Sequence, residues 1–166
     1  MEIMSSLQRG DMSHKTFGLL EHPHLPPMVT TEEVQYKIML VGKNGVGKTA
    51  TAANLTGYSP MENYYETPGI QVWQTYWPAR IRQLNKVMLF HLCLWESGTT
   101  AMRKFDHILP ALKENVDCIL LVFSLLDKSS FDELPHLISR LTEPNDNVCK
   151  IAIGTKYPFI IIYKAM

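Results

Sequence analysis

The chain has 166 residues, of which 46% are hydrophobic and 19% are charged, and its 16 acidic side chains balance its 16 basic ones. These values describe one globular domain with enough apolar material for a core. A neutral chain offers no overall attraction to nucleic acid or to an anionic membrane, so we expect no nucleic-acid partner. No apolar run approaches the roughly 20 residues of a transmembrane segment. We therefore expect an intracellular, cytoplasmic protein.

Cysteine and histidine positions give little sign of a metal centre. Cys93, Cys118 and Cys149 are widely spaced and lie in apolar runs, a pattern that predicts buried free thiols in a reducing compartment. His22 and His24 lie among prolines with no partner ligands nearby. An extended arm is therefore favoured there over a metal site.

The N-terminal part of the domain is predicted to consist of a strand, a loop and a helix, in that order. Residues 1–33 are polar and interrupted by prolines, and we expect an N-terminal extension. It is either a loosely packed arm or a segment whose apolar patch at 17–20 docks on the domain or on a partner. The apolar run at 34–41 predicts a buried strand, and 48–57 predicts a helix that ends at its glycine.

Between this strand and this helix lies a complete phosphate-binding loop, Gly42-Lys43-Asn44-Gly45-Val46-Gly47-Lys48-Thr49. In such a loop the glycine-rich backbone turns its amides toward a diphosphate, and Lys48 reaches the outer phosphates. The hydroxyl of Thr49 is placed to bind Mg²⁺ at the start of the helix. A glycine turn without a ligand is the alternative.

The remaining pattern predicts alternating strands and helices. In chain order these are a loop at 58–70, strands at 72–77 and 87–95, a helix that includes 105–112, a strand at 118–124, a helix at 130–141 that Pro135 interrupts, and a strand at 148–153. We expect the strands at 72–77 and 87–95 to pair as an antiparallel ribbon. Parallel strands that alternate with helices predict a doubly wound α/β sheet with its ligand at the carboxyl ends of the strands.

Several motifs resemble Ras-superfamily small GTPases of the Rab-like kind. They are the loop at 42–49, the Thr-Pro-Gly-Ile run at 67–70 and the Trp-Glu pair at 95–96. Further stretches resemble the Rem/Rab-like small GTPases of the ciliogenesis and planar polarity effector complex, namely 17–21, 45–50, 77–79, 104–107 and 131–135. The resemblance covers residues 16–157 and implies a P-loop NTPase fold with a mostly parallel sheet. It places a small GTPase-like domain at 34–157, incomplete because the last strand and helix are missing, and a divergent apolar tail at 158–166.

The resemblance also implies roles for individual residues. Lys48 would neutralise the β and γ phosphates, and Thr49 and Thr67 would bind Mg²⁺. Because Thr67 would close only on a triphosphate, its loop would report the nucleotide state to a partner. The amide of Gly98 would meet the γ phosphate. The implied ligands are GTP or GDP with Mg²⁺, and the implied nucleotide-binding residues are Asn44, Gly45, Val46, Gly47, Lys48, Thr49, Ala50, Thr67, Gly98, Thr155 and Lys156.

The hydrolytic motif departs from the family pattern. The family has Asp, two residues, Gly and a water-orienting Gln, whereas this chain has Glu96-Ser97-Gly98-Thr99, one residue shorter and without Gln. Thr99 cannot orient an attacking water through an amide. The longer carboxylate of Glu96, on a shortened loop, must also shift relative to the metal. We therefore expect weak or absent hydrolysis and assign no catalytic residue.

The guanine-reading motif departs further. The family has Asn-Lys-x-Asp, and its aspartate accepts both guanine N–H groups, but this chain has Thr155-Lys156-Tyr157-Pro158. Proline cannot accept those hydrogen bonds. We interpret the chain as a truncated or alternative product of a longer protein, with a bare sheet edge and low stability. It has no lipidation motif at its C-terminus.

Three functions follow as hypotheses. The first is a guanine-nucleotide-dependent switch in cilium assembly, planar cell polarity and ciliary protein transport. The resemblance implies the Fuzzy and Inturned proteins as its partners and the cytoskeleton at the cilium basal body as its location. The second is a pseudo-GTPase scaffold subunit of the same complex. The third is a P-loop ATPase or kinase, against which the run at 67–70 argues.

Overall fold

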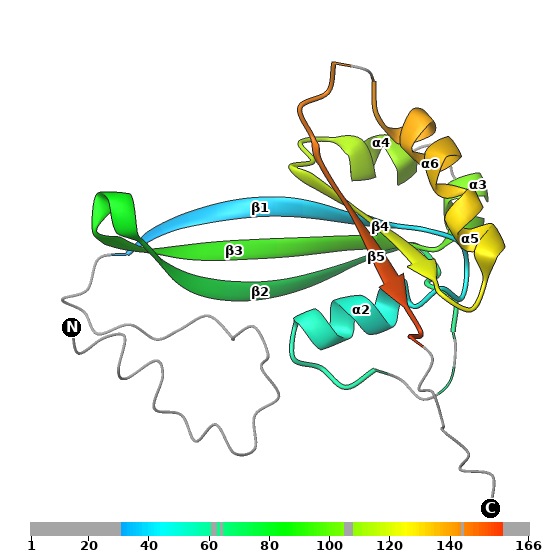
Figure 1. Ribbon diagram of the computed structural model, residues 1–166, viewed down its shortest axis with the longest axis horizontal. Coiled ribbons are helices and arrows are strands. Elements are labelled where there is room, and N and C mark those ends of the chain that lie inside the picture. Colours follow the sequence, from blue (N-terminus) through cyan, green and yellow to red (C-terminus); the bar gives the residue numbers. More distant parts are fainter. Residues whose placement is uncertain (1–30, 61–62, 64, 105–107, 144, 158–166) are drawn as a thin grey trace, which may run out of the picture.

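The computed structural model describes residues 31–60, 63, 65–104, 108–143 and 145–157 (Figure 1). The elements in chain order are β1 (Glu32–Val41), α2 (Lys48–Leu55), β2 (Ile70–Ile81), the 3₁₀ turn η1 (Arg82–Leu84), β3 (Lys86–Ser97), α3 (Thr99–Lys104), α4 (Ile108–Lys113), β4 (Cys118–Ser124), α5 (Lys128–Asp132), α6 (Leu134–Leu141) and β5 (Cys149–Thr155). The predicted alternation of strands and helices is confirmed over this part of the chain.

The described strands form one mixed sheet in the order β2-β3-β1-β4-β5. β1 pairs in parallel with both β3 and β4, and β4 pairs in parallel with β5. β2 pairs antiparallel with β3, which confirms the predicted ribbon. Because β1 lies between β3 and β4, the loop that follows it opens at a switch point of the sheet, where α/β domains bind their ligands.

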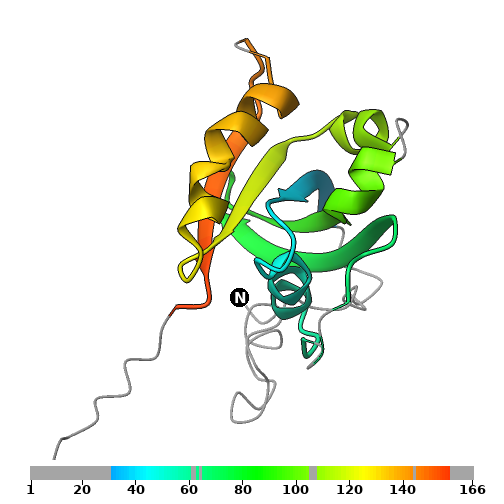
Figure 2. The ribbon, with the colours of Figure 1, turned by 90° about the vertical axis from the view of Figure 1, so that its right-hand side faces the viewer.

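Each face of the sheet is covered by a different set of helices (Figure 2). Met39 and Val41 of β1 point to the face that packs against residues of α3, α4 and α6, whereas Leu40 points to the face that packs against Ala52 of α2. All three strand residues are at most 1% exposed. Alternate side chains of a strand point to opposite faces, so this apolar run is what allows β1 to carry two cores.

The ribbon of β2 and β3 is longer than the predicted segments at 72–77 and 87–95. Its register runs from Ile70 opposite Ser97 to Ile81 opposite Lys86. Pro78 lies within β2, which is tolerated because β2 is an edge strand of the described sheet and proline there removes no hydrogen bond from the interior. With β1, the ribbon extends well beyond the helices (Figure 1).

One sequence prediction is confirmed and another needs correction. The interruption expected at Pro135 in the helix at 130–141 is observed, because α5 ends at Asp132 and α6 begins at Leu134 with Pro135 in its first turn. The first helix begins earlier than expected, at Lys128, where Asp127 caps it. The prediction of buried cysteines holds for Cys93 but is wrong for Cys149, which is exposed. Its strand, β5, is an edge of the described sheet with most of its residues exposed.

Some predictions fall on residues that the structure does not describe. These are residues 1–30 of the extension expected at 1–33, with its apolar patch and its histidine pair, residues 105–107 of an expected helix, and the tail at 158–166 with Pro158. Residues 32 and 33 of that extension belong to β1 instead. Within the described residues, no helix has the length and apolar character needed to cross a membrane.

The central position of β1 makes a prediction about stability. Met39→Ala would lower the free energy of unfolding by about 2–5 kcal/mol, because it leaves a cavity where the side chain is 0% exposed. The measurement is urea unfolding. As a control, Leu126→Ala removes a side chain that is 68% exposed and should change the free energy by about 0.5 kcal/mol or less. Equal effects of the two substitutions would contradict the assignment of Met39 to the core.

Candidate nucleotide-binding site

The loop between β1 and α2 has a backbone that depends on glycine. Gly42 has a φ of 152°, and a Cβ there would lie 2.0 Å from the carbonyl oxygen of Val122 in β4. Gly47 caps the N-terminus of α2 with a left-handed φ of 101°. These two glycines allow the chain to turn sharply off the sheet and start α2 directly behind the loop. The N-terminus of α2 therefore faces the loop, as it does in anion sites.

Lys48 is held across the loop. It is the first residue of α2 and only 6% exposed, and its Nζ donates to the carbonyl oxygens of Gly42 at 3.0 Å and Lys43 at 3.2 Å. Burial lowers the pKa of this ammonium group, while the charge of Glu96 opposes that change. A buried cation with only neutral acceptors gains electrostatically when an anion comes into contact with it.

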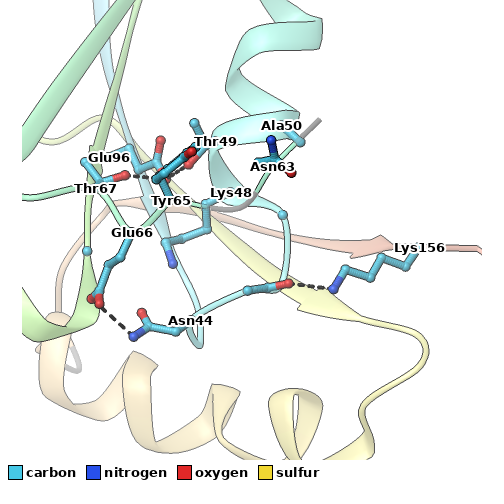
Figure 3. A pocket seen from close by; sticks show the side chains of 13 residues that line it. Asn44, Lys48, Thr49, Ala50, Asn63, Tyr65, Glu66, Thr67, Glu96 and Lys156 are labelled. Atoms are coloured by element: carbon cyan, nitrogen blue, oxygen red, sulfur yellow. Dashed lines mark hydrogen bonds between the residues drawn. The ribbon is translucent and has the colours of Figure 1, made fainter. Parts of the chain in front are cut away.

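Beside Lys48, three oxygen-bearing side chains converge from different segments (Figure 3). The hydroxyl of Thr49, at the start of α2, donates to Oε1 of Glu96 at 2.6 Å. The hydroxyl of Thr67, in the loop before β2, donates to the same oxygen at 3.4 Å. Glu96, near the end of β3, is 1% exposed, and its Oε2 has no hydrogen-bond partner among the described residues.

This group of oxygens fits a magnesium ion. Mg²⁺ prefers oxygen ligands, usually one or two carboxylates together with phosphate oxygens and water. An unpartnered carboxylate oxygen in a buried position is costly, and a cation would relieve that cost. Although the loop after β3 is one residue shorter than the family pattern, the carboxylate of Glu96 still lies in this group of oxygens, because its longer side chain reaches the hydroxyl of Thr49.

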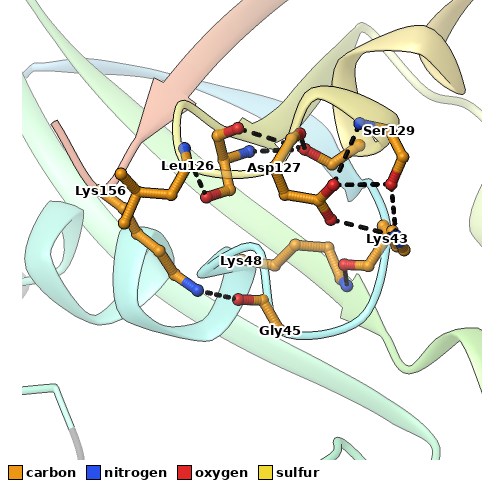
Figure 4. Close-up of polar contacts among 9 residues, drawn as sticks. Lys43, Gly45, Lys48, Leu126, Asp127, Ser129 and Lys156 are labelled. Atoms are coloured by element: carbon orange, nitrogen blue, oxygen red, sulfur yellow. Dashed lines mark hydrogen bonds and ion pairs between the residues drawn. The ribbon is translucent and has the colours of Figure 1, made fainter. Parts of the chain in front are cut away.

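The end of β5 is tied to the underside of the loop. The hydroxyl of Thr155 donates to the carbonyl oxygens of Val46 at 2.5 Å and Phe123 at 2.9 Å. Nζ of Lys156 donates to the carbonyl oxygen of Gly45 at 2.6 Å (Figure 4). Val46 and Thr155 do not line the pocket. Through its bond to the Val46 carbonyl, Thr155 supports the loop on the side that faces away from the pocket.

Lys43 supports the loop from the side of α5. Its Nζ forms an ion pair with Asp127 at 3.0 Å and donates to the hydroxyl of Ser129 at 2.6 Å (Figure 4). Asp127 also accepts the backbone N–H of Ser129 and thereby caps α5. Hydrogen bonds from Ser129 and Lys43 hold the pKa of the Asp127 carboxyl at about 2. The two lysines of the loop thus differ, since Lys43 is engaged with α5 and Lys48 with the phosphate loop itself.

Together these segments surround a pocket of about 270 Å³. Nine of the predicted site residues line it, namely Asn44, Gly45, Gly47, Lys48, Thr49, Ala50, Thr67, Gly98 and Lys156. Four further residues line it that the predicted set lacked, namely Asn63, Tyr65, Glu66 and Glu96. Asn63, Tyr65 and Glu66 immediately precede Thr67, so their proximity in sequence was the available signal. Glu96 was recognised only as a departure from a motif.

A glycine-rich loop after the central strand, a lysine across it and a threonine at the helix start are the features of a P-loop NTPase fold. The sequence of residues 37–159 matches the model of the Ras family. The chain belongs to the Ras family. Its fold is accordingly a Ras-like domain with a mostly parallel sheet.

The chain is also similar to curated relatives. It is 48% identical over 143 residues to "Ciliogenesis and planar polarity effector 2" of Danio rerio, covering 86% of this chain and 57% of the relative. For the protein of that name from Homo sapiens, identity is 41% over 143 residues, with 86% and 55% covered. "GTP-binding protein REM 2" of Rattus norvegicus is 30% identical over 123 residues, with 73% and 34% covered. The chain thus spans little more than half the length of the effector relatives.

The contacts of Thr155 predict a stabilising role. Thr155→Val would lower the free energy of unfolding by about 1–3 kcal/mol, because the carbonyls of Val46 and Phe123 would lose their donor. Thr142→Val is a matched control, since its hydroxyl donates only locally, to Ile138 at the end of α6, and it should cost about 0.5 kcal/mol or less. Chemical denaturation of both variants is the measurement. If Thr155→Val were no more harmful than the control, β5 would not support the loop.

Proposed function

We propose that the protein is a guanine-nucleotide-binding switch with weak or absent hydrolysis. The observation that carries the proposal is the arrangement of Lys48, Thr49 and Glu96, in which a buried cation lies next to a buried, half-satisfied carboxylate. A phosphate chain would satisfy the cation, and Mg²⁺ would satisfy the carboxylate. This arrangement supports phosphates and Mg²⁺, and membership of the Ras family supports guanine as the base. The ligands of the proposal are GTP or GDP with Mg²⁺.

Each residue would contribute a defined interaction. The backbone amides of the loop and Lys48 would bind the phosphates, and the hydroxyls of Thr49 and Thr67 with the carboxylate of Glu96 would hold the metal. When bound, Mg²⁺ neutralises phosphate charge. Thr67 lies in the loop that precedes β2, so that loop would form one side of the metal site.

Slow hydrolysis is supported by the residue that follows Gly98. Thr99 lies where the resemblance would place a glutamine, and its side chain is too short to orient a water as an amide does. Its backbone N–H donates to Oδ1 of Asn44 at 3.3 Å. Its hydroxyl is buried without a partner among the described residues. Nothing in this group supplies the function of the missing glutamine.

The names of the relatives support a cellular role. The effector relatives are named for ciliogenesis and planar polarity. We propose that this protein acts in cilium assembly, planar cell polarity and ciliary protein transport, in the cytoplasm and at the cytoskeleton of the cilium basal body. Its partners in this proposal are the Fuzzy and Inturned proteins. A pseudo-GTPase scaffold in the same complex is the alternative, favoured by the altered residues Thr99 and Pro158.

The central test of nucleotide binding uses the two lysines of the loop. Lys48→Ala should weaken binding of GDP and GTP in the presence of Mg²⁺ at least about tenfold, because a charge-assisted contact is lost. Lys43→Ala is the matched control and should retain binding, because Lys43 is engaged with Asp127 and Ser129. Titration calorimetry gives the Kd values.

The same titrations separate the competing functions. Binding of GTP and GDP in preference to ATP is expected for a guanine-nucleotide switch. Comparable ATP affinity would contradict guanine selection while leaving the phosphate site intact. Failure of the unmodified protein to bind any of these nucleotides would contradict the hypothesis of a nucleotide switch and would favour that of a pseudo-GTPase scaffold.

A second test concerns the metal. Glu96→Gln keeps the shape of the side chain but removes its charge, and it should raise the Mg²⁺ concentration needed to retain bound GDP by about 10–100-fold. Dissociation of a fluorescent GDP derivative, followed as Mg²⁺ is varied, measures this. Glu114→Gln, an exposed residue outside the pocket, is the control. If the Mg²⁺ dependence of Glu96→Gln matched that of the unmodified protein, Glu96 would not contribute to the metal site.

A further inference from the structure

The carboxylate of Glu66 links the loop before β2 to the start of α3. Its Oε1 accepts the backbone N–H of Thr100 at 2.9 Å, and its Oε2 accepts the hydroxyl of Thr100 at 3.0 Å. Glu66 is the residue immediately before Thr67. The loop that carries one of the magnesium-site hydroxyls is therefore bonded directly to the segment that follows β3.

Asn44 of the phosphate-binding loop joins the same network (Figure 3). Its Nδ2 donates to Oε1 of Glu66 at 3.1 Å, and its Oδ1 accepts the backbone N–H of Thr99 at 3.3 Å. A glycine at this position could make neither bond. Asn44 thus lies between the two other segments and contacts both.

Gly98 allows the segments to lie this close. A Cβ at Gly98 would be 2.2 Å from the carbonyl oxygen of Thr67 and 3.1 Å from Cγ of Glu66. The first distance is far inside van der Waals contact with backbone, so any side chain at residue 98 would push the loop before β2 away. The close contact between Gly98 and the loop before β2 is therefore permitted by the missing side chain at residue 98 and does not depend on Glu66 alone.

All donors and acceptors of this network belong to the protein. Closure of a Ras-family loop normally depends on a contact with the γ phosphate. Here a charged acceptor receives three hydrogen bonds from two other segments, and none of them requires a phosphate. Hydrogen bonds to an ionised group are stronger than those between neutral groups.

We propose that Glu66 is a latch, a positioning residue that holds the Thr67 loop closed on the phosphate-binding loop and on the start of α3 whichever nucleotide is bound. Closure is then set mainly by Glu66, Asn44 and Thr100, and the γ phosphate adds little to it. The loop would remain closed after loss of the γ phosphate, so the latch would limit how far the nucleotide switches this loop. This last consequence rests on the proposed nucleotide binding, whereas the latch itself does not.

Amide hydrogen exchange of residues 65–70 tests the latch in protein freed of nucleotide. Glu66→Ala should speed exchange in this segment at least about fivefold, because the loop loses its bonds to Thr100 and Asn44. Glu66→Gln should restore part of the protection, because its amide oxygen can still accept the N–H of Thr100. Glu143→Ala, which removes an exposed carboxylate outside the pocket, should have no effect. Circular dichroism checks that every variant is folded.

A double-mutant cycle distinguishes a specific latch from general loosening. Thr100→Val removes the hydroxyl that bonds Oε2 but keeps the backbone N–H. If Glu66 acts through Thr100, the effects of Glu66→Ala and Thr100→Val on exchange will be less than additive in the double variant. Additive effects would overturn the direct link between these residues. Unchanged exchange in Glu66→Ala would overturn the latch.

The final comparison adds GDP or a non-hydrolysable GTP analogue with Mg²⁺. In the unmodified protein, exchange of residues 65–70 should differ less than about twofold between the two nucleotides. In Glu66→Ala, the triphosphate should protect the segment clearly more than the diphosphate. A large difference already present in the unmodified protein would overturn the proposal. Failure to bind either nucleotide would contradict the proposed function, while the exchange of the nucleotide-free variants would still decide the latch.

Discussion

A buried carboxylate needs partners, and the carboxylate of Glu96 takes them from two other segments of this molecule. Thr49 donates from the start of α2, and Thr67 donates from the loop before β2. Since Glu96 is 1% exposed and one of its oxygens has no partner among the described residues, these bonds leave its charge incompletely compensated. The nearby ammonium of Lys48 and a metal ion are what would complete it.

The sheet explains how these residues come together. β1 ends in the phosphate-binding loop, and β3, its parallel neighbour, ends with Glu96 and Ser97, so both segments emerge at the same edge. The antiparallel β2 starts at that edge, which brings Thr67 beside them. On the other side of β1, β5 delivers Thr155, whose hydroxyl contacts the carbonyl oxygens of Phe123 in β4 and of Val46 in the loop and thereby supports the loop from behind. Strand order therefore brings the segments of the pocket together, and side-chain contacts such as those of Thr155 and Glu66 hold them in place.

Much of this arrangement could be predicted from the sequence. The apolar runs and the glycine-rich loop carry local signals of strand, turn and helix start, and the α/β architecture with its antiparallel ribbon follows from them. The interruption of the helix at Pro135 was predicted because proline is a local signal. The start of α5 at Lys128 was missed because the capping bond of Asp127 is a side-chain contact that periodicity does not reveal. The exposure of Cys149 depends on whether another element covers β5. The apolar residues around it in the sequence do not reveal that β5 is an edge strand of the described sheet.

The site was predictable where its residues form a motif and not where they meet only in space. Lys48 and Thr49 belong to one continuous loop, so spacing alone identified them. Glu66 and Asn44 lie 22 residues apart, and Glu66 meets Thr100 across 34 residues. No local pattern predicts such contacts. Glu96 shows the same limit, since its sequence position suggested a shifted acid while its longer side chain reaches Thr49.

The central claim is that the phosphate and metal site is complete even though the hydrolytic and base-reading motifs are altered. Chromatography of the nucleotide released from purified, denatured protein tests it most directly. The site described above predicts close to one nucleoside di- or triphosphate per chain, lost when Mg²⁺ is removed with a chelator. Protein that carries no nucleotide, and cannot be loaded with any when Mg²⁺ is supplied, would contradict it.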